Sequence, residues 1–210
     1  MPVKPFIYGK SRLAGMISDD ERYQLNRALL SHTLQIISRS MWHKYVLVIS
    51  KGEEALDMAK AFGFNAVIEH PPFGLNRSLQ TVSKNLDEEK AESITVVPAD
   101  LVLLTIEELD EIYTLRMKLP GIIIVPDRFK AGTNILSVNP VGAIPFRYGR
   151  NSFTKHCQSA KNIKLPIKII ESRYLGFDLD TEQDLNELEQ LCPEICQSIP
   201  EICCFQKIFP

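Results

Sequence analysis

The chain has 210 residues, of which 45% are hydrophobic and 24% charged, and its formal net charge is -2. This composition is typical of a globular protein and excludes a general electrostatic attraction to nucleic acid or to an acidic membrane surface. No apolar run reaches the roughly 18 residues of a membrane span, and no charged-then-apolar leader is visible, so we expect a cytoplasmic protein without nucleic-acid or membrane partners.

The first half of the chain alternates segments of helical and strand character. Apolar residues of 19–40 recur at helical spacing behind a capping box of Ser18 and Glu21, which predicts a long amphipathic helix. Short apolar runs predict strands at 45–50, 65–70, 93–97 and 121–127. The intervals carry helical patterns at 53–64, which closes near Gly63, at 75–86, and at 105–119, which begins with Thr105 and Glu108 as a capping box.

This alternation predicts an α/β fold with a mostly parallel sheet, right-handed crossovers and helices on both faces. The uninterrupted apolar strand GIIIV supports it, because such a strand is covered on both sides. Beyond residue 127 the strands 133–140 and 167–172 and the helices 152–160 and 180–191 are separated by longer loops that contain Gly and Pro. These loops predict a substrate-binding lobe on the same sheet, within one domain over 1–190.

Residues 191–210 form an apolar tail that we expect to be irregular and to pack on the domain or on a partner, such as a second copy of the chain. The chain has five cysteines, an odd number in a protein long enough to fold without disulfide bonds, so free thiols are expected. Cys192 and Cys196 have a spacing compatible with a metal or redox pair, but no His or second CxxC completes a ligand set nearby.

A basic loop precedes the first long helix. Lys4, Lys10 and Arg12 surround Gly9, and cations beside a helix amino terminus form a pocket suited to a polyphosphate. The loop matches neither the Walker pattern nor the dinucleotide GxGxxG pattern. An ordinary basic surface loop is the alternative.

Three aspartates follow predicted strands or precede a predicted helix. Asp100 interrupts the apolar stretch SITVVPADLVLLT, while Asp178 and Asp180 alternate in GFDLDTEQDL ahead of a helix that starts at Thr181. Each could cap a turn or a helix. Together they make a carboxylate set suited to Mg2+, which prefers carboxylates plus substrate phosphates. Ligands of open α/β sheets bind beyond the carboxyl ends of the strands, which is where Asp100 and the loops 71–76 and 127–133 are expected.

The sequence lacks a visible nucleophile for acyl transfer. His32, His43, His70 and His156 are scattered, and no Ser or Cys elbow motif accompanies them. Phosphoryl or nucleotidyl transfer needs no protein nucleophile, because a substrate phosphate oxygen can attack while the protein positions the groups and neutralises charge.

In combination, these motifs carry a family resemblance. PVKPFIYGKSRLAG, GLNRSL, VVPADLVLLT, DRFKAGTNILSVNP, GAIPFRYGRNSFTKH and GFDLDTEQDL occur in this order between residues 2 and 188. The chain resembles the guanylyltransferases of coenzyme F-420 biosynthesis, which have a Rossmann-like, GT-A-type nucleotidyltransferase fold. The resemblance implies transfer of GMP from GTP to 2-phospho-L-lactate, phosphoenolpyruvate or 3-phospho-D-glycerate, with release of pyrophosphate and dependence on Mg2+.

The resemblance also implies roles for single residues. Lys10 and Arg12, with Lys4 before them, correspond to triphosphate contacts, and Lys10, Arg12 and Asp100 to the catalytic set. Asn76, Pro98 and Ala99 resemble the guanine and ribose side, while Asp100, Asp178 and Asp180 resemble the Mg2+ ligands. Thr133, Gly149 and Ser152 resemble the acceptor site. The residues themselves support this last assignment, because Arg147, Arg150 and a helix amino terminus flank Ser152 and attract anions. A simple N-cap is the alternative for Ser152.

Other functions of the same fold stay open at this point. A molybdenum-cofactor or sugar-phosphate nucleotidyltransferase is one alternative, against which the blocks GTN and YGRNS argue. A non-catalytic nucleotide-binding protein is another, which the presence of all three aspartates disfavours. The family also has several apolar residues before PVK, so we expect either an unusually short first strand or a chain that begins late.

Overall fold

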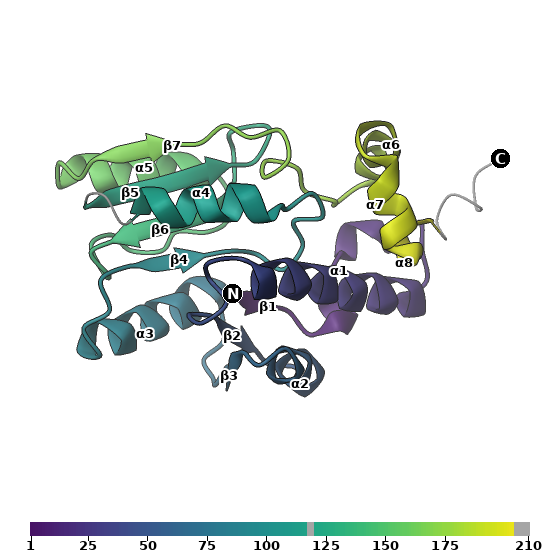
Figure 1. Ribbon diagram of the computed structural model, residues 1–210, viewed down its shortest axis with the longest axis horizontal. Helices are drawn as coiled ribbons and strands as arrows, with labels where there is room; N and C mark the ends of the chain where they lie inside the picture. The colour runs from purple at the N-terminus through teal and green to yellow at the C-terminus, as the bar shows by residue number, and fades with distance from the viewer. Residues whose placement is uncertain (117–119, 204–210) are drawn as a thin grey trace.

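The computed structural model describes residues 1–116 and 120–203 (Figure 1). The helices that surround the sheets are α1 Asp19–Arg39, α2 Glu53–Ala61, α3 Leu75–Glu88, α4 Ile106–Arg116, α5 Ser152–Asn162, α6 Glu182–Leu191, α7 Pro193–Ser198 and α8 Pro200–Cys203. The strands are β1 Pro2–Val3, β2 Leu47–Ser50, β3 Asn65–Ile68, β4 Ile94–Val96, β5 Gly121–Pro126, β6 Thr133–Asn139 and β7 Ile167–Ile169. The predicted elements are all present, and the end of the helix predicted at 105–119 lies outside the described residues.

The strands form two sheets rather than one. A parallel three-stranded sheet has the order β1-β2-β3, and a four-stranded sheet has the order β4-β6-β5-β7. The α/β class is confirmed, but β6 runs antiparallel to both β4 and β5, which the alternation did not predict. The physical reason is the short loop between β5 and β6, since a parallel crossover needs a dozen or more residues.

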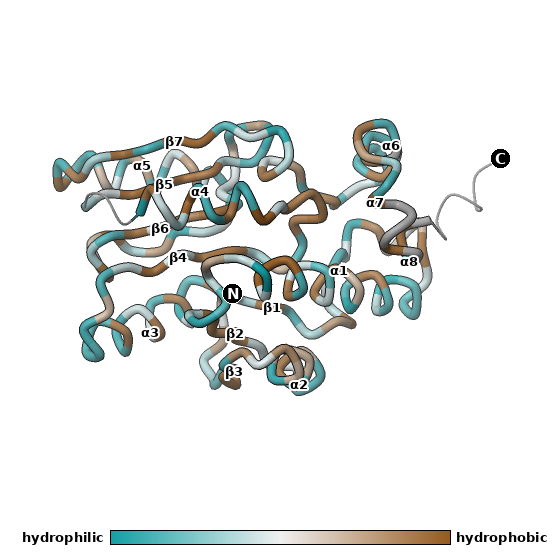
Figure 2. The backbone as a smooth tube through the Cα atoms, viewed as in Figure 1, coloured by the Kyte–Doolittle hydropathy of each residue, from teal (hydrophilic) through white to brown (hydrophobic). Residues whose placement is uncertain are grey.

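Helices cover both faces of the second sheet, as alternate residues of its strands show. Val125 of β5 packs in one hydrophobic cluster with Leu109 of α4, whereas Ile124 packs in another with Ala160 of α5. This division follows from the strand period of two, which sends successive side chains to opposite faces. Figure 2 shows hydrophobic residues along much of β4, β5 and β6, as expected for a sheet buried on both sides.

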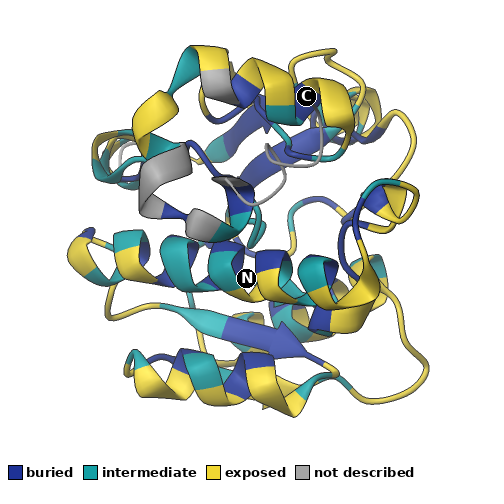
Figure 3. Cartoon of the chain, turned by 90° about the vertical axis from the view of Figure 1, so that its right-hand side faces the viewer, coloured by how far each residue is buried: buried dark blue, intermediate teal, exposed yellow. Residues whose placement is uncertain are grey.

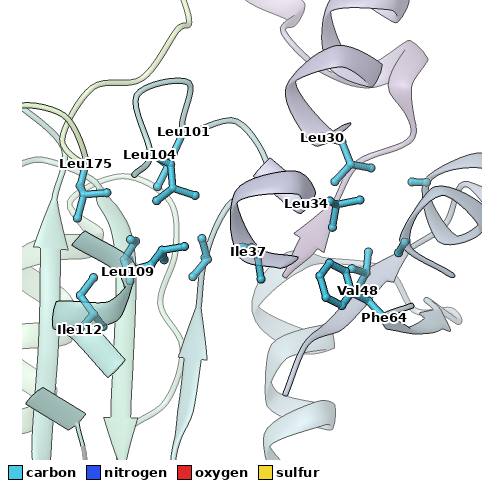
Figure 4. Packing of buried hydrophobic residues seen from close by; sticks show 14 of the residues in the cluster. Leu30, Leu34, Ile37, Val48, Phe64, Leu101, Leu104, Leu109, Ile112 and Leu175 are labelled. Atoms are coloured by element: carbon cyan, nitrogen blue, oxygen red, sulfur yellow. The ribbon is translucent and has the colours of Figure 1, made fainter. Parts of the chain in front are cut away.

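Helix α1 joins the two sheets. Its start is a complete capping box between Ser18 and Glu21, as predicted. Leu34 belongs to a cluster that includes Val48 of β2 on one side and Leu109 of α4 on the other, and Figure 4 shows α1 between them. Figure 3 shows the outward face of α1 exposed and its inward face buried. Because α1 follows the basic loop directly, this packing also fixes where that loop lies.

No strand pairing joins the two sheets within the described ranges. Strand β1 has only two residues, and a cavity of about 820 Å3 lies between β2 and β4, where it is lined by side chains such as Leu47, Ile49 and Val96. The Met1 amino group donates to the Leu47 carbonyl oxygen over 2.7 Å, and burial lowers its pKa to about 5. The first strand is thus short, which is compatible with both alternatives expected from the sequence.

The tail packs on the domain, as expected, but it is not irregular over 193–203. Helices α7 and α8 both begin at proline, which is favoured in the first helical turn because its missing N–H has no partner there. Ile199 and Ile202 are buried against Leu25 and Leu29 of α1. Residues 204–210 lie outside the described part of the chain.

The cysteine and membrane predictions have partial outcomes. Cys157 and Cys192 are free thiols, as expected. The side chains of Cys196, Cys203 and Cys204 lie outside the described set. Among the helices of the described residues, none is both long and apolar enough to span a membrane.

Candidate functional site

The basic loop is held in place by α1. The Asn26 side chain donates to the Phe6 carbonyl oxygen over 2.8 Å, and Arg22 donates to the carbonyl oxygen of Gly9. A side chain at Gly9 would overlap Asn26, so the glycine is needed for the close approach of loop and helix. Lys10 has a φ of 48°, an uncommon backbone conformation for a residue with a side chain. Such a conformation is maintained only where the surrounding structure stabilises it.

Lys10 connects the basic loop to two of the predicted aspartates. Its ammonium lies 2.6 Å from Asp100 Oδ2 and 3.2 Å from Asp180 Oδ1, and its side chain is only 2% exposed. Arg12 Nη1 donates to Asp180 Oδ2 over 3.0 Å from the solvent side. The two carboxylates remain partly open, with side chains 41% and 38% exposed. Asp100 and Asp180, which lie 90 and 170 positions from Lys10 along the chain, thus meet it at one point.

Opposite charges set the pKa values of this pair. Burial alone would lower the pKa of Lys10, but the charges of Asp100 and Asp180 outweigh it and raise the pKa above its ordinary value. For Asp100, burial raises the pKa, whereas the Lys10 charge and hydrogen bond lower it further than burial raises it. The charge of exposed Lys4 makes a smaller contribution that also lowers the pKa of Asp100. Lys10 and Asp100 are therefore both ionised at neutral pH.

Asp178 is the carboxyl group whose negative charge the neighbouring cations do not fully compensate. Its pKa is raised to about 7, first by burial and then by the charge of Asp100, and only partly offset by Lys10. A carboxyl group in this position gains from any further cation nearby. Among residues 1–116 and 120–203, however, no group of three or more His, Cys, Asp or Glu side chains is arranged to hold a metal ion. The three aspartates thus gather around Lys10 and do not form a ready-made cage.

Asp184, whose capping-box position the sequence indicated, and Arg128, which the sequence did not indicate, hold the DLD segment in place. Asp184, whose side chain is 2% exposed, accepts from the backbone N–H groups of Asp180 and Thr181 over 2.8 and 2.6 Å. Arg128 donates to Asp184 and, over 2.7 Å, to Glu187 of the same helix. The spacing of Thr181 and Asp184 in the sequence indicated a capping box, and this box is present in the structure. The Arg128 contact spans 56 residues and had no local signal.

The segment before Asp100 lies against α1. Strand β4 ends at Val96, and the Thr33 hydroxyl of α1 lies 3.1 Å from the Ala99 carbonyl oxygen. Pro98 and Ala99 thus hold Asp100 at the carboxyl end of the strand, where the sequence placed it.

Asn76 lies at the other end of the predicted nucleotide site, where it binds the chain rather than facing solvent. Its amide donates to the Tyr148 carbonyl oxygen over 3.0 Å and accepts from the Tyr148 N–H over 2.6 Å. This pair of bonds joins the start of α3 to the loop that carries Gly149. Its assignment to the guanine side stays a prediction.

The predicted acceptor residues meet around a buried histidine. Thr133 Oγ1 lies 3.1 Å from Nδ1 of His156, and the Arg147 backbone N–H donates to Nε2 of the same ring over 2.8 Å. Ser152, 1% exposed, lies one turn before His156 on α5, and Gly149 has a φ of 117°. Sequence reasoning missed His156, although its i, i+4 spacing from Ser152 places both on one helix face.

The start of β6, which carries Thr133, lies next to the segment that leads into Asp178. Asn134, next to Thr133, donates to the Leu175 carbonyl oxygen over 2.8 Å, and the Arg128 N–H donates to the Gly176 carbonyl oxygen over 2.9 Å. These bonds tie the start of β6 to the segment that leads into Asp178. The charge of Asp127, in the loop between β5 and β6, also contributes to the raised pKa of Asp178.

The chain is similar to proteins of known activity over nearly its whole length. A family model described as "Guanylyl transferase CofC like" matches residues 1–191. Phosphoenolpyruvate guanylyltransferase of Sphaerobacter thermophilus is 33% identical over 195 residues, which cover 92% of each chain. The 3-phospho-D-glycerate guanylyltransferase of Colwellia psychrerythraea is 27% identical over 97% of this chain and 96% of its own. The 2-phospho-L-lactate guanylyltransferase of Methanocaldococcus fervens is 28% identical over 90% of this chain and 82% of its own.

Solved structures agree on the fold. A protein described as a nucleotide-diphospho-sugar transferase from Desulfovibrio desulfuricans has a TM-score of 0.77 at 14% identity and covers 98% of this chain and 92% of its own. A CMP:2-keto-3-deoxy-manno-octonic acid synthetase complexed with CTP has a TM-score of 0.59 at 11% identity, with 92% and 96% covered. At these identities the likeness concerns the arrangement of helices and strands alone, and it agrees with the predicted GT-A-type architecture.

Proposed function

The chain belongs to the CofC-like guanylyl transferase family, and from this premise we propose that it transfers GMP from GTP to a small phosphorylated acid and releases pyrophosphate. Phosphoenolpyruvate, 2-phospho-L-lactate and 3-phospho-D-glycerate, which appear in the names of its relatives, are the candidate acceptors. The role of the product in coenzyme F-420 biosynthesis is part of this proposal. The observation that carries it is the buried Lys10, which ties the basic loop to Asp100 and Asp180.

The reaction needs little covalent chemistry from the protein. An oxygen of the acceptor phosphate attacks the α-phosphorus of GTP, the new P–O bond forms, and the bond to the β-phosphate breaks with pyrophosphate as the leaving group. Because the attacking phosphate is already ionised at neutral pH, no protein base has to remove a proton. Catalysis then rests on holding two anions in line and on neutralising the charge of the triphosphate.

Lys10, Arg12 and Lys4 supply that neutralisation in the proposal. Lys10 is rigid because it is buried and bonded, whereas the Arg12 side chain is 73% exposed and Lys4 is exposed. A triphosphate that enters along the open edges of Asp100 and Asp180 meets the exposed Arg12 and Lys4 before it reaches the fixed, buried Lys10. The predicted nucleotide contacts of Asn76, Pro98 and Ala99 complete this half of the site.

Mg2+ fits the donor set that the aspartates offer. Asp100, Asp178 and Asp180 provide hard oxygen donors, and a divalent cation would favour the ionised form of Asp178, whose pKa is raised first by burial and then by the charge of Asp100. The lack of a three-ligand cage agrees with the habit of Mg2+, which binds one or two carboxylates and completes its shell with water and substrate phosphates. When bound, the ion would neutralise phosphate charge next to Lys10.

Thr133, Gly149 and Ser152 make the acceptor half of the site in this proposal. The buried Ser152 is the first residue of α5, and the first turn of this helix favours an anion at its amino end. Such groups suit the phosphate and carboxylate of a three-carbon acid.

The test is the loss of Asp100. Asp100→Asn keeps the size of the side chain but removes its charge, so we expect pyrophosphate release from GTP and acceptor to fall by at least about a hundredfold. Asp87→Asn, at an exposed position of α3, is the matched control and should retain full activity. Asp87→Asn should unfold at the urea concentration of the wild type, whereas Asp100→Asn, which leaves the buried Lys10 with Asp180 alone, should lose about 2 kcal/mol of stability and still fold. Normal turnover of a folded Asp100→Asn protein would contradict the proposed role.

A further inference from the structure

We propose that His156 is a positioning residue that turns the Thr133 hydroxyl into a fixed hydrogen-bond donor toward an oxyanion of the acceptor. This inference rests on the proposed function, because it takes Thr133 as part of the acceptor site. It concerns a side chain that lies beneath the site and touches no substrate. Its basis is the pair of hydrogen bonds that the two ring nitrogens make.

The backbone decides which ring nitrogen carries the proton. The Arg147 N–H points at Nε2 over 2.8 Å, and a backbone N–H can only donate, so Nε2 has to accept. A neutral imidazole with an unprotonated Nε2 carries its proton on Nδ1. That nitrogen lies 3.1 Å from Thr133 Oγ1, to which it therefore donates.

The surroundings keep the ring neutral. His156 is fully buried, at 0% exposure, and the Tyr148 ring meets it edge to face with centroids 5.1 Å apart. Burial, followed by the charges of Arg147 and Lys155, lowers its pKa to about 4. In a charged ring Nε2 would also carry a proton, and this proton would repel the proton of the Arg147 N–H. At neutral pH a single protonation state remains.

The consequence falls on Thr133. A hydroxyl has one proton and can accept two hydrogen bonds. Because the histidine occupies an acceptor position of Oγ1, the Thr133 proton turns to another partner. No other hydrogen bond of this hydroxyl occurs among the described residues, and Thr133 is 9% exposed. The hydroxyl is thus prepared to donate to an anion at the start of β6.

The same ring also places the rest of the acceptor site. Its Nε2 holds the Arg147 backbone, and Asn76 holds the adjacent Tyr148 backbone from the other side through two hydrogen bonds. Gly149 follows directly, while Ser152 lies one turn before His156 on α5. One buried side chain therefore connects the strand, the loop and the helix that carry the predicted acceptor contacts.

The first test needs no substrate. In protein labelled with 15N-histidine, two-dimensional 15N–1H correlation spectra distinguish the two neutral tautomers and the charged ring. We expect the His156 ring to be neutral with its proton on Nδ1 at pH 7. A proton on Nε2, or a charged ring, would overturn the inference whatever reaction the protein catalyses.

The second test separates positioning from folding. His156→Gln keeps an acceptor for the Arg147 N–H but loses the donor to Thr133, whereas His156→Asn keeps a donor near the Nδ1 position. We expect His156→Gln to raise the KM for the acceptor about tenfold to a hundredfold, as for the loss of a hydrogen bond to a charged group, with the KM for GTP within about twofold. His156→Asn should restore part of the loss. His43→Gln, at an exposed position after α1, is the control and should leave the KM for the acceptor and the KM for GTP unchanged.

A double-mutant cycle completes the design. If the histidine acts through the threonine, Thr133→Val and His156→Gln together should raise the KM for the acceptor no more than Thr133→Val alone. Multiplicative effects, or equal increases of KM for GTP and acceptor, would overturn the inference. If His156→Gln does not fold, the tautomer measurement on the wild type decides. If the wild type transfers GMP to no acid, the proposed function fails. The NMR measurement of the His156 tautomer still tests separately whether the ring donates to Thr133.

Discussion

Replacing Lys10 with methionine removes the one cation that, among the described residues, is bonded to both Asp100 and Asp180. Methionine fills nearly the same volume, so the change leaves packing largely intact while the carboxylates lose bonds of 2.6 and 3.2 Å. Breaking a buried ion pair costs about 3–5 kcal/mol. Here both carboxylates are about two-fifths exposed and can be rehydrated, so we expect a loss of about 2 kcal/mol.

The assay is urea unfolding at pH 7.5 and low ionic strength, compared with Lys60→Met. Lys60 lies 3.0 Å from Asp57, but both side chains are largely exposed, at 60% and 71%, so this control should lose less than about 0.5 kcal/mol. Millimolar Mg2+ should restore more stability to Lys10→Met than to the wild type, because the uncompensated carboxylates become better ligands. Equal stability of Lys10→Met and Lys60→Met would refute the reasoning that Lys10 neutralises the aspartates.

Three further predictions follow from single features. Burial lowers the pKa of His156 from 6.5 to about 4, so on acidification the unfolded chain binds this proton before the folded chain does. The free energy of unfolding, measured with urea, should therefore fall as the pH drops from 6.5 to 4, and it should fall less steeply in His156→Asn. Gly9→Ala should raise the KM for GTP about tenfold in steady-state kinetics, because the added methyl overlaps a side chain of α1, whereas Gly15→Ala, with open space around it, should not. Arg128→Met leaves the buried Asp184 unpaired and should lower the free energy of unfolding by about 3 kcal/mol; thermal denaturation equal to that of the wild type would contradict this.

Local signals predicted the elements and the positions of charged residues along them. The capping box at Ser18 located the start of α1, and Pro98 located the end of β4 ahead of Asp100. These features depend on neighbours a few residues away, so the sequence contains them directly. The family resemblance assigned Lys10, Asp100 and Asp180 to one site, but it did not predict the ion pairs that Lys10 makes with the two aspartates.

Features that depend on distant pairing could not be predicted. The antiparallel direction of β6 depends on the short loop after β5 and on partners in β4. The bonds between Asn76 and Tyr148 span 72 residues and reveal themselves only in the folded chain. His156 lies between these cases: its spacing from Ser152 was visible, but its contact with Thr133 was not. The tail helices were missed because the segment was interpreted as an irregular apolar appendage, although proline can begin a helix, as Pro193 and Pro200 do.

One measurement tests the central claim most directly, namely that the site around Lys10 and Asp100 joins GMP to an acceptor phosphate. Phosphorus NMR follows GTP mixed with each of the three acids, with ATP and CTP as alternative donors. The account predicts that with GTP and at least one acid, pyrophosphate and a new pair of coupled diphosphate signals appear in equal amounts, and that Asp100→Asn shows neither. Release of inorganic phosphate in place of pyrophosphate, or no new diphosphate with any acid, would contradict it.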